Sequence, residues 1–439
     1  MWIGIDDTDS RFGGCTTYVA FELVKELQCN GYLVVGWPRL VRLNPNIPWK
    51  TRGNGAVSFY ITKNQESCVY IGQNDEIDLM GCLHCSKKMF SDQDKKEIIS
   101  LVGRVVESSA ELKEDNTNPG FVVMKNPPDP SVYWKTVRMM MSLDEIIEIL
   151  NNQHAYYKMY NNGRGIIGAT AAISWRPSQN ATFEMICYRK KNRWGLHREI
   201  NEQSVMYMDS ACPTTFDSYD YDNEYMCIAP HSPCPVLYGV RGTDANRLMI
   251  CQKQIMSEPK QGWMLFETNQ GTDDHLQVAS LSNLKPFQSV IVKGKVCSQP
   301  LVLKGGHVVF KIKDNQFNTV DCAAYEPTKQ FRSIIKKLCV GDQVIVYGGV
   351  RKKPVTINIE KIKITDLATV YEKIENPLCP QCGKHMKSKG RNQGYHCKRC
   401  KTKKNNPIIK EKQRRLSIGF YEVPSVARRH LSKPLKLMK

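Results

Sequence analysis

Three carboxylates lie within four residues near the start of the chain. Asp6, Asp7 and Asp9 directly follow an apolar run at 2–5, and the sequence GGCTT comes next at 13–17. Clustered carboxylates repel one another unless a cation lies between them, and carboxylate oxygens are common ligands of Mg²⁺. Backbone N–H groups at the start of the helix predicted from residue 18 on favour phosphate. The pattern predicts a magnesium and nucleotide site, and an exposed acidic turn is the simpler alternative.

A second phosphate-facing loop is predicted at 50–55, with the sequence KTRGNG. Gly53 and Gly55 allow close approach of the backbone, while Lys50 and Arg52 bring positive charge beside it. A hairpin turn built on Asn-Gly explains the same sequence equally well. The residues predicted to contact ATP phosphates in the two loops are Thr8, Gly13, Gly14, Thr17, Lys50, Arg52, Gly53, Asn54 and Gly55.

Four cysteines near the C-terminus have metal-binding spacing. Cys379 and Cys382 form one C-x-x-C pair, and Cys397 and Cys400 form the other. Four thiolates on two tight turns are typical of a closed tetrahedral Zn²⁺ site, which has a structural role. Lysines and arginines surround both pairs, so we expect a four-cysteine zinc ribbon that presents positive charge to nucleic-acid phosphates.

The stretch 199–240 contains no lysine or arginine but many carboxylates and tyrosines. Carboxylates and aromatic faces together suit a small organic cation, through charge pairing and cation–π attraction. An acidic surface loop, or a face that only repels nucleic acid, would have the same composition. The residues of this stretch that we take as candidates for a cation pocket are Asp209, Asp217, Asp220 and Tyr219.

Charge and cysteine content limit the class of protein. The 439 residues carry a net charge of +19, of which +16 falls in 379–439 and +3 in the rest. A basic end on a nearly neutral body points to a polyanion, most simply nucleic acid. Seventeen cysteines in a chain of this length fit thiols and metal ligands in a reducing compartment, not a disulfide framework. We expect a cytoplasmic protein with no membrane segment, and no oligomer is implied.

Several elements are needed to position these residues. Strands are predicted at 2–5, 32–43 and 56–62, and helices at 18–27, 92–112 and 142–150. From 287 on, five alternating strands are predicted at 290–297, 307–313, 319–325, 343–350 and 355–364, with a helix at 328–338 between the third and the fourth. That order is typical of an OB-fold, which binds single-stranded nucleic acid, although another small barrel is the alternative.

Several motifs resemble one family in the same order along the chain. They are IDDTDS at 5–10, CTT at 15–17, RLNP at 42–45, KTRGNGA at 50–56, GRG at 163–165, GVRG at 239–242, TNQGT at 268–272, GGH at 305–307 and the RRHLSKP ending. Together with the barrel and the ribbon they resemble the archaeal isoleucine-tRNA 2-agmatinylcytidine (agmatidine) synthetases. A lone pair, Cys82 and Cys85, has no place in that pattern, and we expect buried thiols there rather than half a zinc site.

The resemblance implies an ATP-dependent ligase that joins agmatine to C2 of the wobble cytidine in a CAU anticodon, so that the isoleucine tRNA reads AUA. It implies phosphorylation of Thr16, and ATP ending as AMP with pyrophosphate or phosphates. Phosphorylating cytidine O2 would make this oxygen expellable, with Mg²⁺ on Asp6, Asp7 and Asp9 absorbing charge. The cofactors implied are ATP, Mg²⁺ and structural Zn²⁺.

The implied fold is multidomain α+β. A kinase-like α/β catalytic domain and a ferredoxin-like agmatine-binding domain are interleaved over 1–275, a five-stranded OB-fold β-barrel covers 276–370, and the zinc ribbon with a basic tail covers 371–439. Two other functions fit parts of the sequence. One is a non-enzymatic single-strand-binding protein built on the barrel and ribbon, and the other is a kinase of a small metabolite, which would not need the ribbon.

Overall fold

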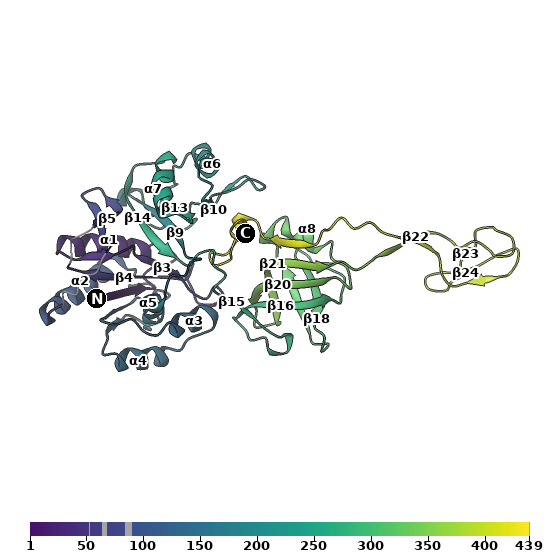
Figure 1. The fold of residues 1–439 in the computed structure, drawn as a ribbon, viewed down its shortest axis with the longest axis horizontal. Coiled ribbons are helices and arrows are strands. Elements are labelled where there is room, and N and C mark those ends of the chain that lie inside the picture. The colour runs from purple at the N-terminus through teal and green to yellow at the C-terminus, as the bar shows by residue number, and fades with distance from the viewer. Residues whose placement is uncertain (52, 64–67, 84–89, 439) are drawn as a thin grey trace.

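The computed structural model describes residues 1–51, 53–63, 68–83 and 90–438. Figure 1 shows three bodies in a row: a large α+β part, a β-barrel beside it, and a small ribbon on an extended stalk. No helix in these ranges is both long and apolar enough to cross a membrane. The chain end returns from the ribbon past the barrel and lies at the junction of the two larger bodies.

One mixed sheet runs through the whole α+β part. Its strands are ordered β10-β13-β9-β14-β5-β6-β2-β4-β1-β7-β8, and β3 pairs with both β14 and β4. The strands are β1 (Trp2–Asp6), β2 (Leu33–Val35), β3 (Arg39–Arg42), β4 (Gly55–Thr62), β5 (Cys68–Asn74), β6 (Asp78–Cys82), β7 (Gly120–Met124), β8 (Tyr156–Met159), β9 (Thr182–Arg189), β10 (Thr215–Phe216), β13 (Val236–Gly242) and β14 (Lys260–Thr268). The central strand β1 is antiparallel to both of its neighbours, β4 and β7.

Helices cover both faces of this sheet. α1 (Thr16–Cys29) and α2 (Asp92–Ser109) pack on one face, in a core that contains Ile3, Ile5 and Phe121. α4 (Leu143–Asn152) and α5 (Gly165–Ser174) pack on the other face together with α3 (Ser131–Arg138). The predicted strand 2–5 and the three predicted helices are confirmed. The prediction of one strand over 32–43 was wrong, because Gly36 adopts a positive φ and the chain turns between β2 and β3.

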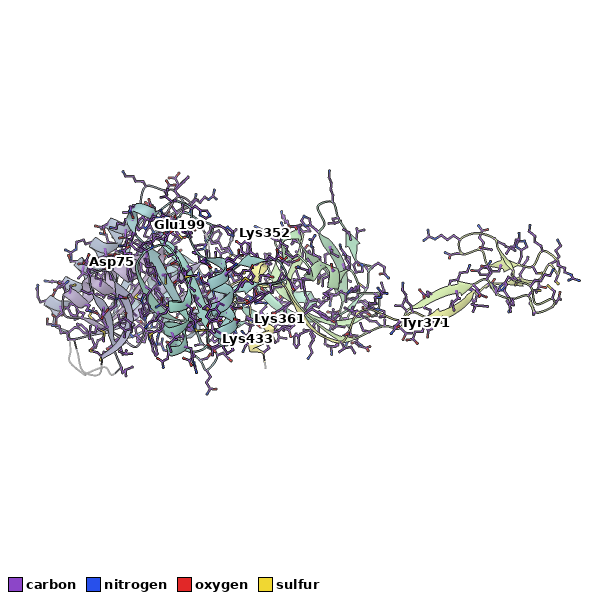
Figure 2. All side chains as sticks on the ribbon, turned by 90° about the horizontal axis from the view of Figure 1, so that it is seen from above. Asp75, Glu199, Lys352, Lys361, Tyr371 and Lys433 are labelled. Atoms are coloured by element: carbon purple, nitrogen blue, oxygen red, sulfur yellow. A yellow bond between two sulfur atoms is a disulfide. The ribbon has the colours of Figure 1, made fainter. Side chains whose placement is uncertain are left out.

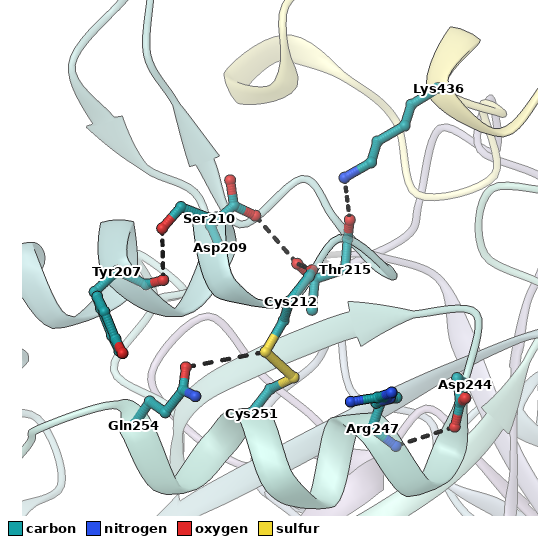
Figure 3. Close-up of a disulfide and its surroundings, with 10 residues drawn as sticks. All are labelled: Tyr207, Asp209, Ser210, Cys212, Thr215, Asp244, Arg247, Cys251, Gln254 and Lys436. Atoms are coloured by element: carbon teal, nitrogen blue, oxygen red, sulfur yellow. Dashed lines mark hydrogen bonds between the residues drawn. A yellow bond between two sulfur atoms is a disulfide. The ribbon is translucent and has the colours of Figure 1, made fainter.

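Two helices cover the half of the sheet built by β9, β13 and β14. α6 (Glu202–Ala211) and α7 (Ala245–Cys251) enclose a separate core against these strands. A disulfide between Cys212 and Cys251 joins the ends of the two helices (Figure 3). The cysteine content predicted thiols and metal ligands only, so this bond corrects that expectation for one pair. Spacing alone does not reveal it, since the two residues meet only after both helices have packed.

The barrel confirms the predicted arrangement of five strands and one helix. Its strands are β16 (Ser289–Val296), β18 (Val308–Lys313), β19 (Thr319–Ala324), β20 (Gln343–Val350) and β21 (Thr356–Asp366). Pairing of β16 with both β18 and β20, and of β19 with β21, closes the barrel. The helix α8 (Phe331–Ile335) lies between the third and fourth strands and is shorter than predicted. A turn of 3₁₀ helix over Glu326–Thr328 precedes it.

The ribbon is carried on a two-stranded stalk. β22 (Tyr371–Glu375) pairs with β26 (Ile408–Glu411), and the short strands β23 (Lys387–Ser388), β24 (Tyr395–His396) and β25 (Lys403–Lys404) form the ribbon itself. The chain then adds β27 (Gly419–Glu422) to the edge of β21. The remaining segment 423–438, here called the strap, runs over the α+β part. Figure 2 shows Tyr371 at the base of the stalk and Lys433 of the strap near Lys361 of the barrel.

Candidate active site

A cavity of about 750 Å³ opens beside the end of β1. The structure brings most of the predicted phosphate and metal residues to its wall. These are Asp6, Asp7, Asp9, Thr16, Thr17, Lys50, Gly53, Asn54 and Gly55. Thr8, Gly13 and Gly14 form the turn that supports this wall and are not part of the cavity lining, and Arg52 lies outside the described residues. Two loops far apart in the sequence therefore face one space.

The acidic corner is formed where β1 stops. Asp7 has a φ of 56°, a left-handed conformation that ends the strand and turns the chain sharply. Asn118, in the loop before β7, donates a hydrogen bond from Nδ2 to Oδ2 of Asp7 at 3.4 Å. The hydroxyl of Thr8 donates to Oγ1 of Thr16 at 3.1 Å, which fixes the first residue of α1 beside the acids. The corner is thus held by side chains from the turn after β1, from α1 and from the loop before β7.

The carboxylates of this corner resist ionisation. Burial raises the pKa of Asp6 well above its usual value, and the charges of Asp7 and Asp9 raise it further. Burial and the charge of Asp9 raise the pKa of Asp7 to about 6, while Asn118 and Arg164 oppose that shift. A divalent cation would stabilise the ionised carboxylates against both burial and their mutual repulsion, so the donor set fits Mg²⁺.

Gly168 makes room for Asp6. A Cβ atom added at this position of α5 would lie 1.8 Å from Oδ2 of Asp6, and the backbone there is helical, so contact alone requires glycine. We expect Gly168→Ala to displace the Asp6 carboxylate and to lower the affinity for Mg-ATP about tenfold or more. Isothermal titration with ATP and Mg²⁺ measures this. Gly103→Ala, where the nearest atom would be 3.8 Å away, is the matched helix control.

Another part of the cavity wall is positively charged. The loop between β3 and β4 places Gly53 and Gly55 against the guanidinium of Arg42, and Asn54 has a positive φ of 47°. Burial and the neighbouring Arg429 lower the pKa of Lys50 to about 8. An anion beside the Lys50 ammonium would stabilise its charged form. A cavity with carboxylates on one wall and cations on the other suits a metal-bound triphosphate.

Motif spacing missed Glu184, which also lines the cavity. This residue of β9 contacts Arg42 at 3.3 Å and Arg241 at 3.2 Å, and Gln270 donates to it as well. Burial alone would raise the pKa of Glu184, but Arg241 and Arg42 together hold it below its usual value. One carboxylate therefore orients two guanidinium groups. The sequence feature that could have identified Glu184 was its position as the single carboxylate in the mostly apolar segment 182–189.

The strap forms another part of the wall. Ser425, Val426, Arg428 and His430 line the cavity, with the His430 ring against Gly53. Burial lowers the pKa of His430 well below its usual value, and Arg42, Arg241 and Lys50 lower it further, so its imidazole is neutral. The sequence showed the RRHLSKP motif but no element that would return it to the first strand.

The four residues predicted for a cation pocket lie outside the cavity lining. Asp217 forms a buried ion pair with Arg428 of the strap, and Asp220 accepts a hydrogen bond from the Val426 backbone N–H at 3.1 Å. Asp209 accepts hydrogen bonds from Thr215 and Tyr221, and the Tyr219 hydroxyl donates to Glu202 at 2.9 Å. Tyr225 and His231 of the same acidic stretch do line the cavity. The role of the four residues stays a prediction.

The four ribbon cysteines converge. Ligand atoms of Cys379, Cys382, Cys397 and Cys400 all lie within 4.8 Å of one another. Sulfur atoms around a tetrahedral Zn²⁺ with bonds of about 2.3 Å are roughly 3.8 Å apart. The donor set fits zinc, as the spacing predicts. Of the isolated pair, Cys82 is a buried thiol at the end of β6, as expected, and Cys85 lies outside the described residues.

Three family models match the chain. They are described as the TiaS TCKD domain over 2–162, the TiaS FLD domain over 163–275 and the TiaS C-terminal zinc ribbon domain over 376–416. The chain is 43% identical to TiaS of Methanocaldococcus jannaschii, an isoleucine-tRNA 2-agmatinylcytidine synthetase, covering 100% of this chain and 99% of that protein. It is 40% identical to the TiaS of Archaeoglobus fulgidus, covering 99% and 97%.

Solved structures agree with these relatives. The chain matches a complex of TiaS with isoleucine tRNA and ATP with a TM-score of 0.85 and 38% identity, covering 99% of this chain and 96% of that one. It matches a complex of TiaS with the same tRNA, AMPCPP and agmatine with a TM-score of 0.81 and 36% identity over the same shares. Likeness of this extent covers the acidic corner, the barrel and the ribbon in one alignment. The chain belongs to the isoleucine-tRNA 2-agmatinylcytidine synthetase (TiaS) family.

Proposed function

We propose that this protein is an ATP-dependent ligase that joins agmatine to C2 of the wobble cytidine of the isoleucine tRNA with a CAU anticodon. The single observation that carries the proposal is the cavity that unites Asp7, Thr16 and Lys50 in a chain of this family. Relatives have been solved with isoleucine tRNA and ATP, and with AMPCPP and agmatine. The first 275 residues would then hold the kinase-like and ferredoxin-like domains, interleaved through the shared sheet.

The acidic wall would bind the metal ion of Mg-ATP, and the basic wall would bind its phosphates. Asp6, Asp7 and Asp9 would hold Mg²⁺, and the N-terminus of α1 with the 50–55 loop would bind the phosphates. When bound, Mg²⁺ offsets negative charge that develops on the transferred phosphoryl group. Glu184 keeps Arg42 and Arg241 aimed into the same space, where they can pair with phosphate oxygens.

Phosphoryl transfer to cytidine O2 explains why a triphosphate is needed. Oxygen bound to C2 is a poor leaving group, whereas phosphate leaves readily once the agmatine nitrogen has attacked C2 and lost a proton. Thr16 carries its hydroxyl at the start of α1, within hydrogen-bond distance of Thr8, and faces the cavity. This position supports its role as the phosphorylated threonine.

We expect Thr16→Ala to lose the phosphothreonine and most product formation. Intact-mass spectrometry of the protein measures the phosphothreonine, and nucleoside analysis of the tRNA measures the product.

The amine pocket is proposed within the acidic stretch 199–240. Asp209 is the best residue for a test, because the hydrogen bonds that the structure gives its carboxylate come from the Thr215 and Tyr221 hydroxyls, whereas Asp217 anchors the strap. Asp209→Asn should raise the KM for agmatine about fivefold while the KM for ATP stays unchanged. Initial rates at varied agmatine measure this. If the agmatine KM equals that of the wild type, the guanidinium binds away from Asp209.

The experiment that tests the function uses purified protein, ATP, Mg²⁺, agmatine and an unmodified transcript of the CAU tRNA. Mass spectrometry of the digested nucleosides would detect agmatine on the wobble cytidine. A transcript with a wobble uridine serves as the matched control. Tight tRNA binding without ATP consumption or adduct would favour the non-enzymatic single-strand-binding function instead.

A further inference from the structure

One imidazole in the catalytic cavity has no part in the phosphoryl transfer proposed above. His430 of the strap lines the cavity, and its Nε2 edge faces Gly53 of the 50–55 loop. A Cβ atom added at Gly53 would lie 3.2 Å from Nε2 of His430. Among the residues that the structure describes, none forms a hydrogen bond with this ring. The imidazole can therefore exchange a proton with a molecule bound in the cavity.

The backbone around His430 is fixed. The carbonyl of His430 accepts a hydrogen bond from the Gly271 N–H at 2.8 Å, and the carbonyl of Leu431 accepts one from the Asp273 N–H at 2.8 Å. The Leu431 side chain is buried in a core that also contains Val41. Because the backbone is bonded and the next side chain is packed, the imidazole is already positioned before a substrate enters.

The strap joins the 50–55 loop to the acidic stretch proposed for the amine. Arg428 forms a buried ion pair with Asp217 of that stretch. His430 follows two residues later and faces Gly53, in the loop that would bind the phosphates. The imidazole thus lies between the stretch proposed for agmatine and the loop proposed for the phosphates. C2 of the cytidine must react with both of these substrates, so it has to lie in the same region.

Other groups that could take up a proton are engaged. The acidic corner would hold Mg²⁺, and Glu184 is paired with Arg42 and Arg241. Of the described residues, one other histidine lines the cavity, namely His231, and its Nε2 shares a hydrogen bond with the Tyr225 hydroxyl. His430 is therefore the imidazole of the described lining that has no protein partner.

Bound phosphates should make this imidazole a better proton acceptor. Burial lowers the pKa of His430, and the charges of Arg42, Arg241 and Lys50 lower it further. Glu184 offsets part of the charge of the two arginines. Phosphate oxygens paired with the three cations would offset the rest, so the affinity of the ring for a proton would rise once the triphosphate is bound.

We propose that His430 is the general base that removes a proton from the attacking amine of agmatine. The inference rests on the proposed function. Agmatine arrives as an ammonium, whose nitrogen has no free electron pair until one proton has left. The imidazole takes this proton, and the nitrogen forms its bond to C2 of the phosphorylated cytidine. The C2–O bond then breaks, and the phosphate leaves with the electron pair and takes up the second proton of the nitrogen. The imidazolium returns its proton to solvent.

The test compares His430→Gln with His197→Gln, which makes the same change at an exposed histidine outside the cavity lining. Glutamine keeps a hydrogen-bonding group of similar reach but does not take up a proton at neutral pH. We expect kcat for agmatine transfer to fall about 100-fold at pH 7 in His430→Gln. The KM for ATP and the amount of phosphothreonine should equal those of the control. Initial rates and intact-mass spectrometry measure these quantities.

The pH dependence separates proton transfer from a structural role. Without the base, the rate depends on the fraction of agmatine whose amine is already unprotonated, which rises about tenfold per pH unit. The loss in His430→Gln should therefore shrink to about tenfold at pH 8. The cations and carboxylates of the cavity titrate in both proteins, so the ratio of the two rates cancels their effect.

Three results would overturn the proposal. They are a rate of His430→Gln equal to that of the control, a loss that is the same at pH 7 and pH 8, and a loss that appears only as a raised KM for ATP. If the variant does not fold, the wild type still decides, because a tenfold rise of its own kcat from pH 7 to pH 8 would mean that no base acts. A wild type that makes no adduct contradicts the proposed function itself, whereas an active His430→Gln contradicts only the role of His430.

Discussion

Asp7→Asn should abolish agmatine transfer while making the metal-free protein harder to unfold. Loss of one of the three carboxylates weakens the magnesium site, so we expect product formation to fall about 1000-fold, equivalent to roughly 4 kcal/mol of transition-state stabilisation. The same residue costs the folded state stability. Its pKa rises from 3.8 in the absence of burial to about 6, so the folded protein binds a proton more tightly than the unfolded chain.

The sign of the pH effect follows from that difference. Between pH 4 and 6 the folded state holds the extra proton, so the contribution of Asp7 to stability falls as the pH rises, by on the order of 3 kcal/mol in total. Above pH 6 the penalty is complete, and the neutral amide of the variant removes it. Agmatine transfer should have the opposite pH dependence and increase as the pH passes 6, because Mg²⁺ binds the ionised carboxylate.

Thermal unfolding at pH 8 measures the change in stability, and nucleoside mass spectrometry measures the loss of agmatine transfer. Added Mg²⁺ should stabilise the wild type and leave Asp7→Asn unchanged. Asp115→Asn makes the same chemical change at an exposed loop position and serves as the control. An inactive variant that unfolds at a lower temperature than the wild type would mean that Asp7 has a mainly structural role.

Cys397→Ser should release the zinc and greatly weaken tRNA binding without loss of the ATP site. The four sulfurs are the main internal structure of the ribbon, where Met386 and the cysteines form its small core. Without the metal such a domain unfolds, and its lysines and arginines no longer present a fixed surface. We expect tRNA affinity to fall about 100-fold at moderate salt.

Metal analysis measures the zinc content, filter binding measures the affinity for tRNA, and titration measures the affinity for ATP. Cys29→Ser, at an exposed cysteine that ends α1, is the matched control and should keep zinc and affinity. The stalk and the barrel lie between the ribbon and the α+β part, whose residues form most of the cavity lining, so ATP binding should be equal in both variants. A zinc-free variant with wild-type tRNA affinity would contradict the proposed role of the ribbon in RNA binding.

Local patterns predicted the parts of the fold that depend on local chemistry. Alternation along each strand and the helix between the third and fourth were enough for the barrel, and two C-x-x-C pairs were enough for the ribbon. The acidic corner was also visible, because strand, carboxylates and helix follow one another within 29 residues. Each of these features has its determinants close together in sequence.

Long-range pairing was not accessible in the same way. Strand β14 lies between β9 and β5, which come from distant parts of the chain, and no periodicity specifies that choice. Glu184 acquires its role only because β9 and β13 place it beside Arg241, and His430 because the strap returns to Gly53. The candidate cation residues illustrate the same limit, since the partner of Asp217 is an arginine from the end of the chain.

The strap also determines whether a shortened chain can act. His430 and Arg428 line the cavity, and Lys433 donates its backbone N–H to Asp273, so a segment that follows the ribbon completes the wall that begins at β1. Assembly of the site therefore waits until residues 423–438 have been synthesised and have left the ribosome. A polypeptide ended by premature termination near residue 422 would have the acidic corner, the barrel and the ribbon but no finished active site.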